Sequence, residues 1–284
     1  MMRHVVHERF SYSDSIILVN AVIQTFYTDN YSEFDIFWET ARDQFAYKLF
    51  KSNRETIIHE YLWFVSDNTS VEEEFRISGY GEEMFVFYEN TLKDFNVKIP
   101  AKIIPNFDYI NKHGFCEECK SCKKLINYVD WIASKIEEFK PNIIHSAFHI
   151  LMLNKHFLRD FHEKLAEYLE RDKDILLELY PEFIAETGKI KRMSFWPVWL
   201  KRGVFFRDKG VCTICRNPLS GDLFLGIDPD IDHIVPLDRF GNNDPSNLQI
   251  LCNKCNNKKR NYSSETSSYD IPYWNIPLPN NYED

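Results

Sequence analysis

Two pairs of cysteines in the C-terminal quarter of the chain constrain its fold more than any other feature. Cys212 and Cys215 form one C-x-x-C pair, Cys252 and Cys255 form the second, and 36 residues separate the pairs. Four thiolates at this spacing fill a tetrahedral zinc shell and leave no coordination position open, so the predicted metal is structural. A segment of roughly 60 residues buries little apolar surface, and a zinc ion compensates for its small core.

The residues before these cysteines are predicted to be mainly helical. The chain has 284 residues, which suggests two domains, and only four of its nine glycines precede position 200. Apolar residues recur at helical spacing in the segments 33–49 (with Ser32 as N-cap), 54–66, 82–95 and 123–139. Pro141 is expected to end the last of these helices, and the apolar run in 82–95 leaves a strand open as an alternative. One or two helices are predicted across 142–180, and a short one at 197–208.

The charge is divided unevenly along the chain. The net charge is −9, but residues 1–188 carry −11, residues 189–262 carry +6 and residues 263–284 carry −4. A basic segment inside an acidic protein predicts contact with phosphates. The proline-punctuated tail is predicted to be an extended arm. Because no apolar run is long enough for a signal peptide or a membrane span, we expect a cytoplasmic protein without membrane contact.

The residues around the cysteine pairs form an ordered series of motifs. Residues 231–237 read IDHIVPL, a Gly-Asn-Asn-Asp loop follows, and residues 247–260 read NLQILCNKCNNKKR. Over about 205–260 this series resembles HNH endonucleases of the ββα-metal (His-Me finger) superfamily. The resemblance implies a small α+β HNH domain stapled by zinc at 189–265. The helical periodicity and the scarcity of glycine predict a mainly α domain at 1–188, and the composition predicts an extended tail at 266–284.

Phosphodiester hydrolysis needs an activated water and a cation at the leaving oxygen. Three residues are predicted to provide these, and a fourth to hold the loop beside them. His233 is the predicted general base, because an unperturbed histidine titrates near pH 6.5. By resemblance, Asp232 and Asn256 bind the catalytic metal, and Asn247 fixes the loop that presents His233. A carboxylate and an amide oxygen suit Mg²⁺, for which Mn²⁺ can substitute. A helix-capping role for Asn256, and the adjacent Asn257 as the ligand, are the alternatives.

Two further groups of residues are candidates for binding. Lys254, Lys258, Lys259 and Arg260 are predicted to contact the phosphate backbone, with a solvated surface as the alternative. His113, Cys116, Cys119 and Cys122 offer four zinc ligands at three-residue steps, provided that Gly114 makes a turn, and reduced thiols are the alternative.

These features predict a metal-dependent endonuclease that cuts DNA, one strand per active site. Double-strand cleavage then needs a dimer or a larger complex, and the acidic N-terminal domain is expected to bind a protein or restrain the nuclease. The architecture resembles effectors of bacterial antiviral defence. The alternatives are a zinc-stapled module that binds nucleic acid or protein without cutting it, and a nuclease that acts on RNA.

Overall fold

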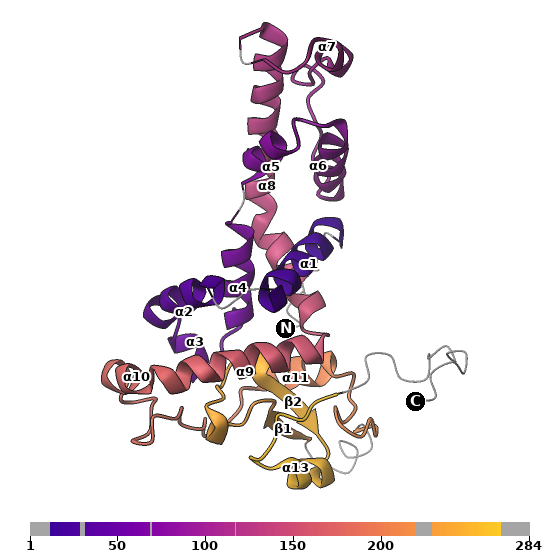
Figure 1. Ribbon diagram of the computed structural model, residues 1–284. Helices are drawn as coiled ribbons and strands as arrows, with labels where there is room; N and C mark the ends of the chain where they lie inside the picture. Colours follow the sequence, from indigo (N-terminus) through magenta and orange to yellow (C-terminus); the bar gives the residue numbers. More distant parts are fainter. Residues whose placement is uncertain (1–11, 29–31, 69, 117, 220–228, 268–284) are drawn as a thin grey trace, which may run out of the picture. The chain divides into compact units, whose positions relative to one another are not determined.

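The computed structural model describes residues 12–28, 32–68, 70–116, 118–219 and 229–267. They belong to two compact units (Figure 1). The first unit comprises residues 1–37 and 58–150, and the second comprises residues 38–57 and 151–284. The second unit therefore joins the cysteine-bearing segment to residues 38–57 and 151–188, which the sequence analysis placed in the N-terminal domain. Most of the predicted tail at 266–284 lies outside the described residues.

All regular elements among the described residues of the first unit are helices. Its helices are α1 (Tyr12–Thr28), the start of α2 (Ser32–Gln44), α4 (Ile57–Ser66), α5 (Val71–Ile77), α6 (Glu82–Asp94), α7 (Phe107–His113) and α8 (Lys120–Leu151). One core cluster joins α5, α6, α7 and α8, with Phe85 and Tyr128 among its fully buried members. None of the described helices is both long and apolar enough to cross a membrane.

Most of the predicted helices are present, with two differences in their bounds. The predicted helix 33–49 is divided into α2 and the short α3 (Tyr47–Phe50) by a turn at residues 45 and 46. The segment 82–95 is helical, so the strand alternative is wrong. The predicted end at Pro141 is also wrong, because α8 continues to Leu151. Apolar side chains on both sides of the proline, such as Ile136 and Ile144, are buried, and this burial outweighs the cost of about 3 kcal/mol for an interior proline.

The second unit holds a small ββα arrangement. Strands β1 (Asp230–His233) and β2 (Leu248–Leu251) pair antiparallel, and α13 (Asn253–Lys259) follows directly and contacts both (Figure 1). The short 3₁₀ turns η1 (Leu237–Arg239) and η2 (Pro245–Asn247) lie between the strands. The unit also contains most of α2, the short α3, and helices α9 (Lys155–Arg171), α10 (Lys173–Leu179) and α11 (Val198–Arg207). The mainly helical fold with a small α+β part at the C-terminus is confirmed.

A buried ion cluster ties three elements of the second unit together. Asp208 follows α11 and is only 6% exposed. Its carboxylate pairs with Lys155 from α9 and with Arg207, and it accepts the backbone N–H of Ile250 in β2 at 3.0 Å. The two cations hold the pKa of this carboxyl well below its usual range, although burial alone would raise it.

Replacing Asp208 with Asn is expected to destabilise the protein by about 3–5 kcal/mol, because Lys155 and Arg207 would lose the carboxylate that neutralises their buried charges. Urea unfolding measures the loss. Asp238→Asn is the matched control, since Asp238 pairs with Lys189 at the surface at 3.9 Å and its loss should cost less than about 1 kcal/mol. Equal losses in both variants would contradict the role of the buried cluster.

Candidate active site

The four predicted zinc ligands lie together. The Sγ atoms of Cys212, Cys215, Cys252 and Cys255 are all within 4.8 Å of one another. The first pair sits on a turn beside β2, where the N–H of Thr213 donates to the carbonyl of Ile250 at 3.0 Å. The second pair starts α13, with Cys252 as its N-cap. Four sulfurs from two segments suit a closed tetrahedral zinc site, which would join the turn to β2 and α13.

The last part of the loop between the two strands, residues 242–247, carries polar side chains that are fully buried. Asn247 holds it closed: its Oδ1 accepts the N–H of Val235 at 2.9 Å, and its Nδ2 donates to the carbonyls of Val235 and Asn242. The loop passes so close to itself that a Cβ on Gly241 would lie 1.9 Å from the carbonyl oxygen of Val235. Asn247 thus fixes the segment that follows His233.

His233 ends β1, and its hydrogen bond to Asn243 determines which ring nitrogen carries a proton. The Nδ2 of Asn243 donates to the carbonyls of Phe50 and Lys191, so its Oδ1 is left to accept a hydrogen bond. That oxygen is 3.0 Å from Nε2 of His233. Nε2 therefore carries the proton, and Nδ1 is the basic nitrogen of the neutral ring. Burial lowers the pKa of His233 to about 4, so the ring is neutral at pH 7.

Asp232 precedes His233 and is held by two donors on one oxygen. Its Oδ2 accepts from Nε2 of Gln249, the paired residue on β2, and from Nζ of Lys259, each at 3.0 Å. Burial raises the pKa of this carboxyl, and the ammonium of Lys259 opposes that shift. The same ammonium donates to the carbonyl of His233 at 2.8 Å. Lys259 is 2% exposed, so it lies inside the site and not on the outer face of α13.

The other predicted site residues on or next to α13 differ in how far their side chains are exposed to solvent. Asn256 is half-buried, whereas Asn257 is exposed and donates from Nδ2 to Oδ1 of Asn253 at 2.8 Å. The remaining predicted phosphate contacts, Lys254, Lys258 and Arg260, are exposed. Arg192 is exposed, and its charge acts on both Asp232 and His233. It belongs to the basic segment 189–262, for which phosphate contact was predicted, but Arg192 itself was not among the predicted site residues.

The donor set around Asp232 fits Mg²⁺ better than a soft metal. Lys259 and Gln249 bind only Oδ2, which leaves Oδ1 as a hard oxygen ligand. Oε1 of Gln249 is a second hard oxygen beside the carboxylate, buried and without a hydrogen-bond partner in the described structure. Asn256, the second ligand predicted from the sequence, is half-buried on α13, which contacts β1.

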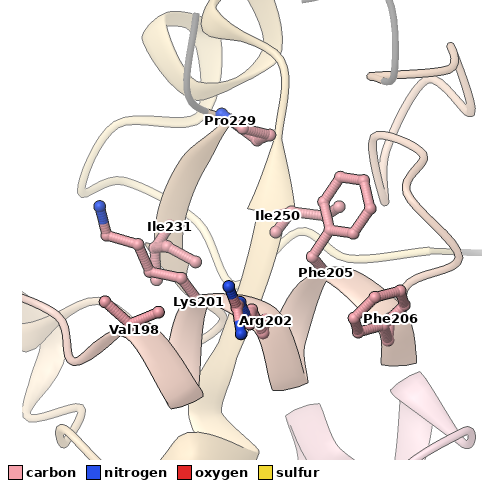
Figure 2. Close-up of a pocket in the computed structure, with 8 residues that line it drawn as sticks. All are labelled: Val198, Lys201, Arg202, Phe205, Phe206, Pro229, Ile231 and Ile250. Atoms are coloured by element: carbon pink, nitrogen blue, oxygen red, sulfur yellow. The ribbon is translucent and has the colours of Figure 1, made fainter. Parts of the chain in front are cut away.

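A hollow of about 450 Å³ lies in the same unit (Figure 2). It is lined by Val198, Lys201, Arg202, Phe205, Phe206, Pro229, Ile231 and Ile250. Neighbouring residues on a strand point to opposite faces, so Ile231 and Asp232 face away from each other. The hollow is therefore on the opposite face of the sheet from Asp232. The same alternation within a strand would turn His233 away from Asp232, but His233 is the last residue of β1, where the regular alternation ends.

Comparison with known proteins identifies this part of the chain. Residues 212–262 match the family model described as HNH endonuclease. The C-terminal part of the chain is thus an HNH endonuclease domain, and its four-cysteine cluster fits a zinc site. No curated protein and no solved structure matched the chain.

Removing the metal from the four-cysteine cluster is expected to unfold the turn, β2 and α13, because zinc binding supplies folding free energy here. Chelation of the wild type and the substitution Cys255→Ser should each cost more than about 3 kcal/mol of stability. Thermal unfolding followed by circular dichroism measures the effect. Added Zn²⁺ should restore the chelated wild type but not the variant; a wild type unaffected by complete zinc removal would contradict the site.

His162 of α9 anchors the loop and makes its stability depend on pH. Nδ2 of Asn242 donates to Nδ1 of His162 at 3.0 Å, which leaves Nε2–H to donate to Oγ of Ser246 at 2.8 Å. Burial lowers the pKa of His162 to about 3. Below pH 6.5 the unfolded chain binds a proton that the folded chain does not, so stability falls as the pH falls.

When the pH is lowered from 7 to 5, we expect the lowered pKa of His162 to reduce the free energy of unfolding by about 2 kcal/mol. His162→Gln should lower stability at pH 7 but show a loss toward pH 5 that is smaller by about that amount. Urea unfolding of both proteins at the two pH values measures the difference, and the contribution of His233 is common to both. Identical pH dependence in the two proteins would refute the assignment.

Proposed function

We propose that the chain is a metal-dependent endonuclease that hydrolyses DNA, with Asp232, His233 and Asn256 at its active site. The observation that carries the proposal is the hydrogen bond from His233 to Asn243 at 3.0 Å. It leaves Nδ1 of a neutral imidazole as the base, at the end of the strand that also presents Asp232. A zinc-binding domain that only binds its ligand does not need a neutral imidazole whose Nδ1 can accept a proton.

In the proposed reaction, Nδ1 of His233 takes a proton from the attacking water. Asn243 holds the ring in the required tautomer and stabilises the imidazolium that forms, because its Oδ1 accepts from Nε2. Asp232 and Asn256 would hold Mg²⁺, which when bound stabilises negative charge on the phosphate and the leaving oxygen. Lys259 and Gln249 hold Oδ2 of Asp232 so that Oδ1 faces the ligand position.

Exposed cations next to the site would position the phosphate backbone. Arg192 is proposed as the nearest contact, with Lys254, Lys258 and Arg260 on the outer face of α13. These groups bind phosphates without reading bases, which favours weak sequence preference. One metal position in each chain cuts one strand, so a double-strand break would need a second copy or a second visit.

The biological setting that we propose is antiviral defence. The support is the architecture: an acidic, helical N-terminal part is joined to an HNH domain, as in bacterial effectors in which a variable domain controls the nuclease. In this setting the N-terminal unit would bind the controlling partner.

His233→Ala is expected to lower the rate of nicking of supercoiled plasmid in Mg²⁺ by about 10²–10⁴-fold, because general base catalysis contributes that much. Asn256→Ala should also lose most activity, whereas its matched control Asn257→Ala should stay within about twofold, since Asn257 points to Asn253 on the exposed face. Conversion of supercoiled to open-circular plasmid, with and without EDTA, measures these rates.

Cleavage that survives His233→Ala, or that depends on Asn257 and not on Asn256, would contradict the assignment. An RNA of the same sequence tested in parallel separates the two substrates, and faster cleavage of RNA would favour an RNA nuclease. A wild type that binds plasmid in Mg²⁺ without cutting it would favour the binding module.

A further inference from the structure

A second cluster of metal-binding residues lies in the first unit, far along the chain from the HNH domain. It occupies the connection between α7, which ends at His113, and α8, which begins at Lys120. Gly114 makes the turn that the sequence requires: its φ is +77°, and its N–H donates to the carbonyl of Ile110 at 2.8 Å. The chain therefore leaves the helical path between His113 and the cysteines, and the three-residue steps no longer carry the side chains around a helix axis.

This turn brings the ligand atoms of three residues together. The ligand atoms of His113, Cys116 and Cys119 lie within 4.8 Å of one another, and Nε2 of His113 is 3.5 Å from Sγ of Cys116. The four sulfurs of the HNH cluster satisfy the same upper limit.

Backbone N–H groups connect a fourth sulfur to the cluster. The N–H of Cys116 points to Sγ of Cys122 at 3.3 Å, and the N–H of Cys122 points to Sγ of Cys119 at 3.3 Å. The second pair of the HNH cluster has the same feature, with the N–H of Cys255 3.4 Å from Sγ of Cys252. Such donors stabilise thiolates, which are the form of cysteine that binds metals. Cys122 is fully buried and its Sγ is 3.9 Å from the carbonyl of Gly114, so it lies next to the group of three but outside its 4.8 Å limit and would have to move inward to complete the site.

We propose that His113, Cys116, Cys119 and Cys122 bind a second zinc ion. Three sulfurs and one imidazole form the Cys₃His set of closed structural sites, and soft thiolates select zinc over Mg²⁺. The ion would fasten the end of α7 to the start of α8. Both helices contribute to one core cluster, in which Ile110 of α7 and Leu125 of α8 are buried, so the metal would hold this end of the unit in place. The site is independent of the nuclease.

The cysteine count gives the test a simple form. The chain has seven cysteines, of which the HNH cluster uses four and the proposed site uses the other three. The full-length protein purified under reducing conditions should therefore contain two zinc ions per chain, measured by elemental analysis and native mass spectrometry. With both ions bound, no thiol should react rapidly with a thiol reagent.

Paired variants assign each ion to its site. Cys116→Ser/Cys119→Ser and Cys212→Ser/Cys215→Ser should each bind one zinc ion per chain in place of two. Cobalt replacement gives a second readout that does not depend on stability: in the Cys212→Ser/Cys215→Ser protein, tetrahedral Co²⁺ bands should remain, and adding His113→Ala should shift or abolish them.

Two results would overturn the proposal. The first is a wild type that contains one zinc ion and three rapidly reacting thiols, together with a Cys116→Ser/Cys119→Ser variant that still contains that ion. The second is a proteolytic peptide covering residues 114–123 whose mass is lower by two hydrogens. Such a peptide would show that two of these cysteines form a disulfide in place of a metal site.

Discussion

The loop from Asn242 to Asn247 is made of polar side chains that water cannot reach, and the candidate site depends on their hydrogen bonds. Asn242, Asn243, Asp244, Ser246 and Asn247 are all 0% exposed. An unpaired polar group at such a depth costs about 1–3 kcal/mol, so each group must find its partner within the protein. The partners come from distant segments: Asn243 binds Phe50 and Lys191, Asp244 accepts the N–H of Ile57, and Asn242 binds His162. The position of His233 is thus fixed by residues nearly two hundred positions away along the chain.

This dependence explains why the second unit includes residues 38–57. A zinc cluster and two short strands can hold β2 and α13, but they supply no acceptors for the side chain of Asn243. Phe50 supplies one acceptor, and the backbone N–H of Asn243 donates to the carbonyl of Leu49 at 2.8 Å. The same contacts set the tautomer of His233, because the side-chain nitrogen of Asn243 is bound to two carbonyls and only its oxygen is left for His233. The stability of the loop and the tautomer of the proposed base therefore depend on the same hydrogen bonds.

Sequence alone predicted the parts of the site that follow local rules. The cysteine spacing predicted the cluster, and the order of motifs predicted the ββα fold and the place of Asn247 in the loop. It did not predict Lys259 beside Asp232, because a run of lysines resembles a solvated face and only the packing of α13 on β1 selects the one that turns inward. Asn243 and Arg192 were missed because their contacts are long-range. Pro141 was misread because the burial of α8 on both sides outweighs a local helix breaker.

In the proposed active site, Asp232 and Asn256 hold the catalytic cation, with Lys259 on the other oxygen of the carboxylate. Anomalous diffraction from crystals of the protein soaked in Mn²⁺ tests this arrangement. We expect a peak at about 2.1 Å from Oδ1 of Asp232 and from the side-chain oxygen of Asn256, with Nδ1 of His233 facing the phosphate position. A peak held by Asn257, or no peak at Asp232 under saturating Mn²⁺, would contradict it.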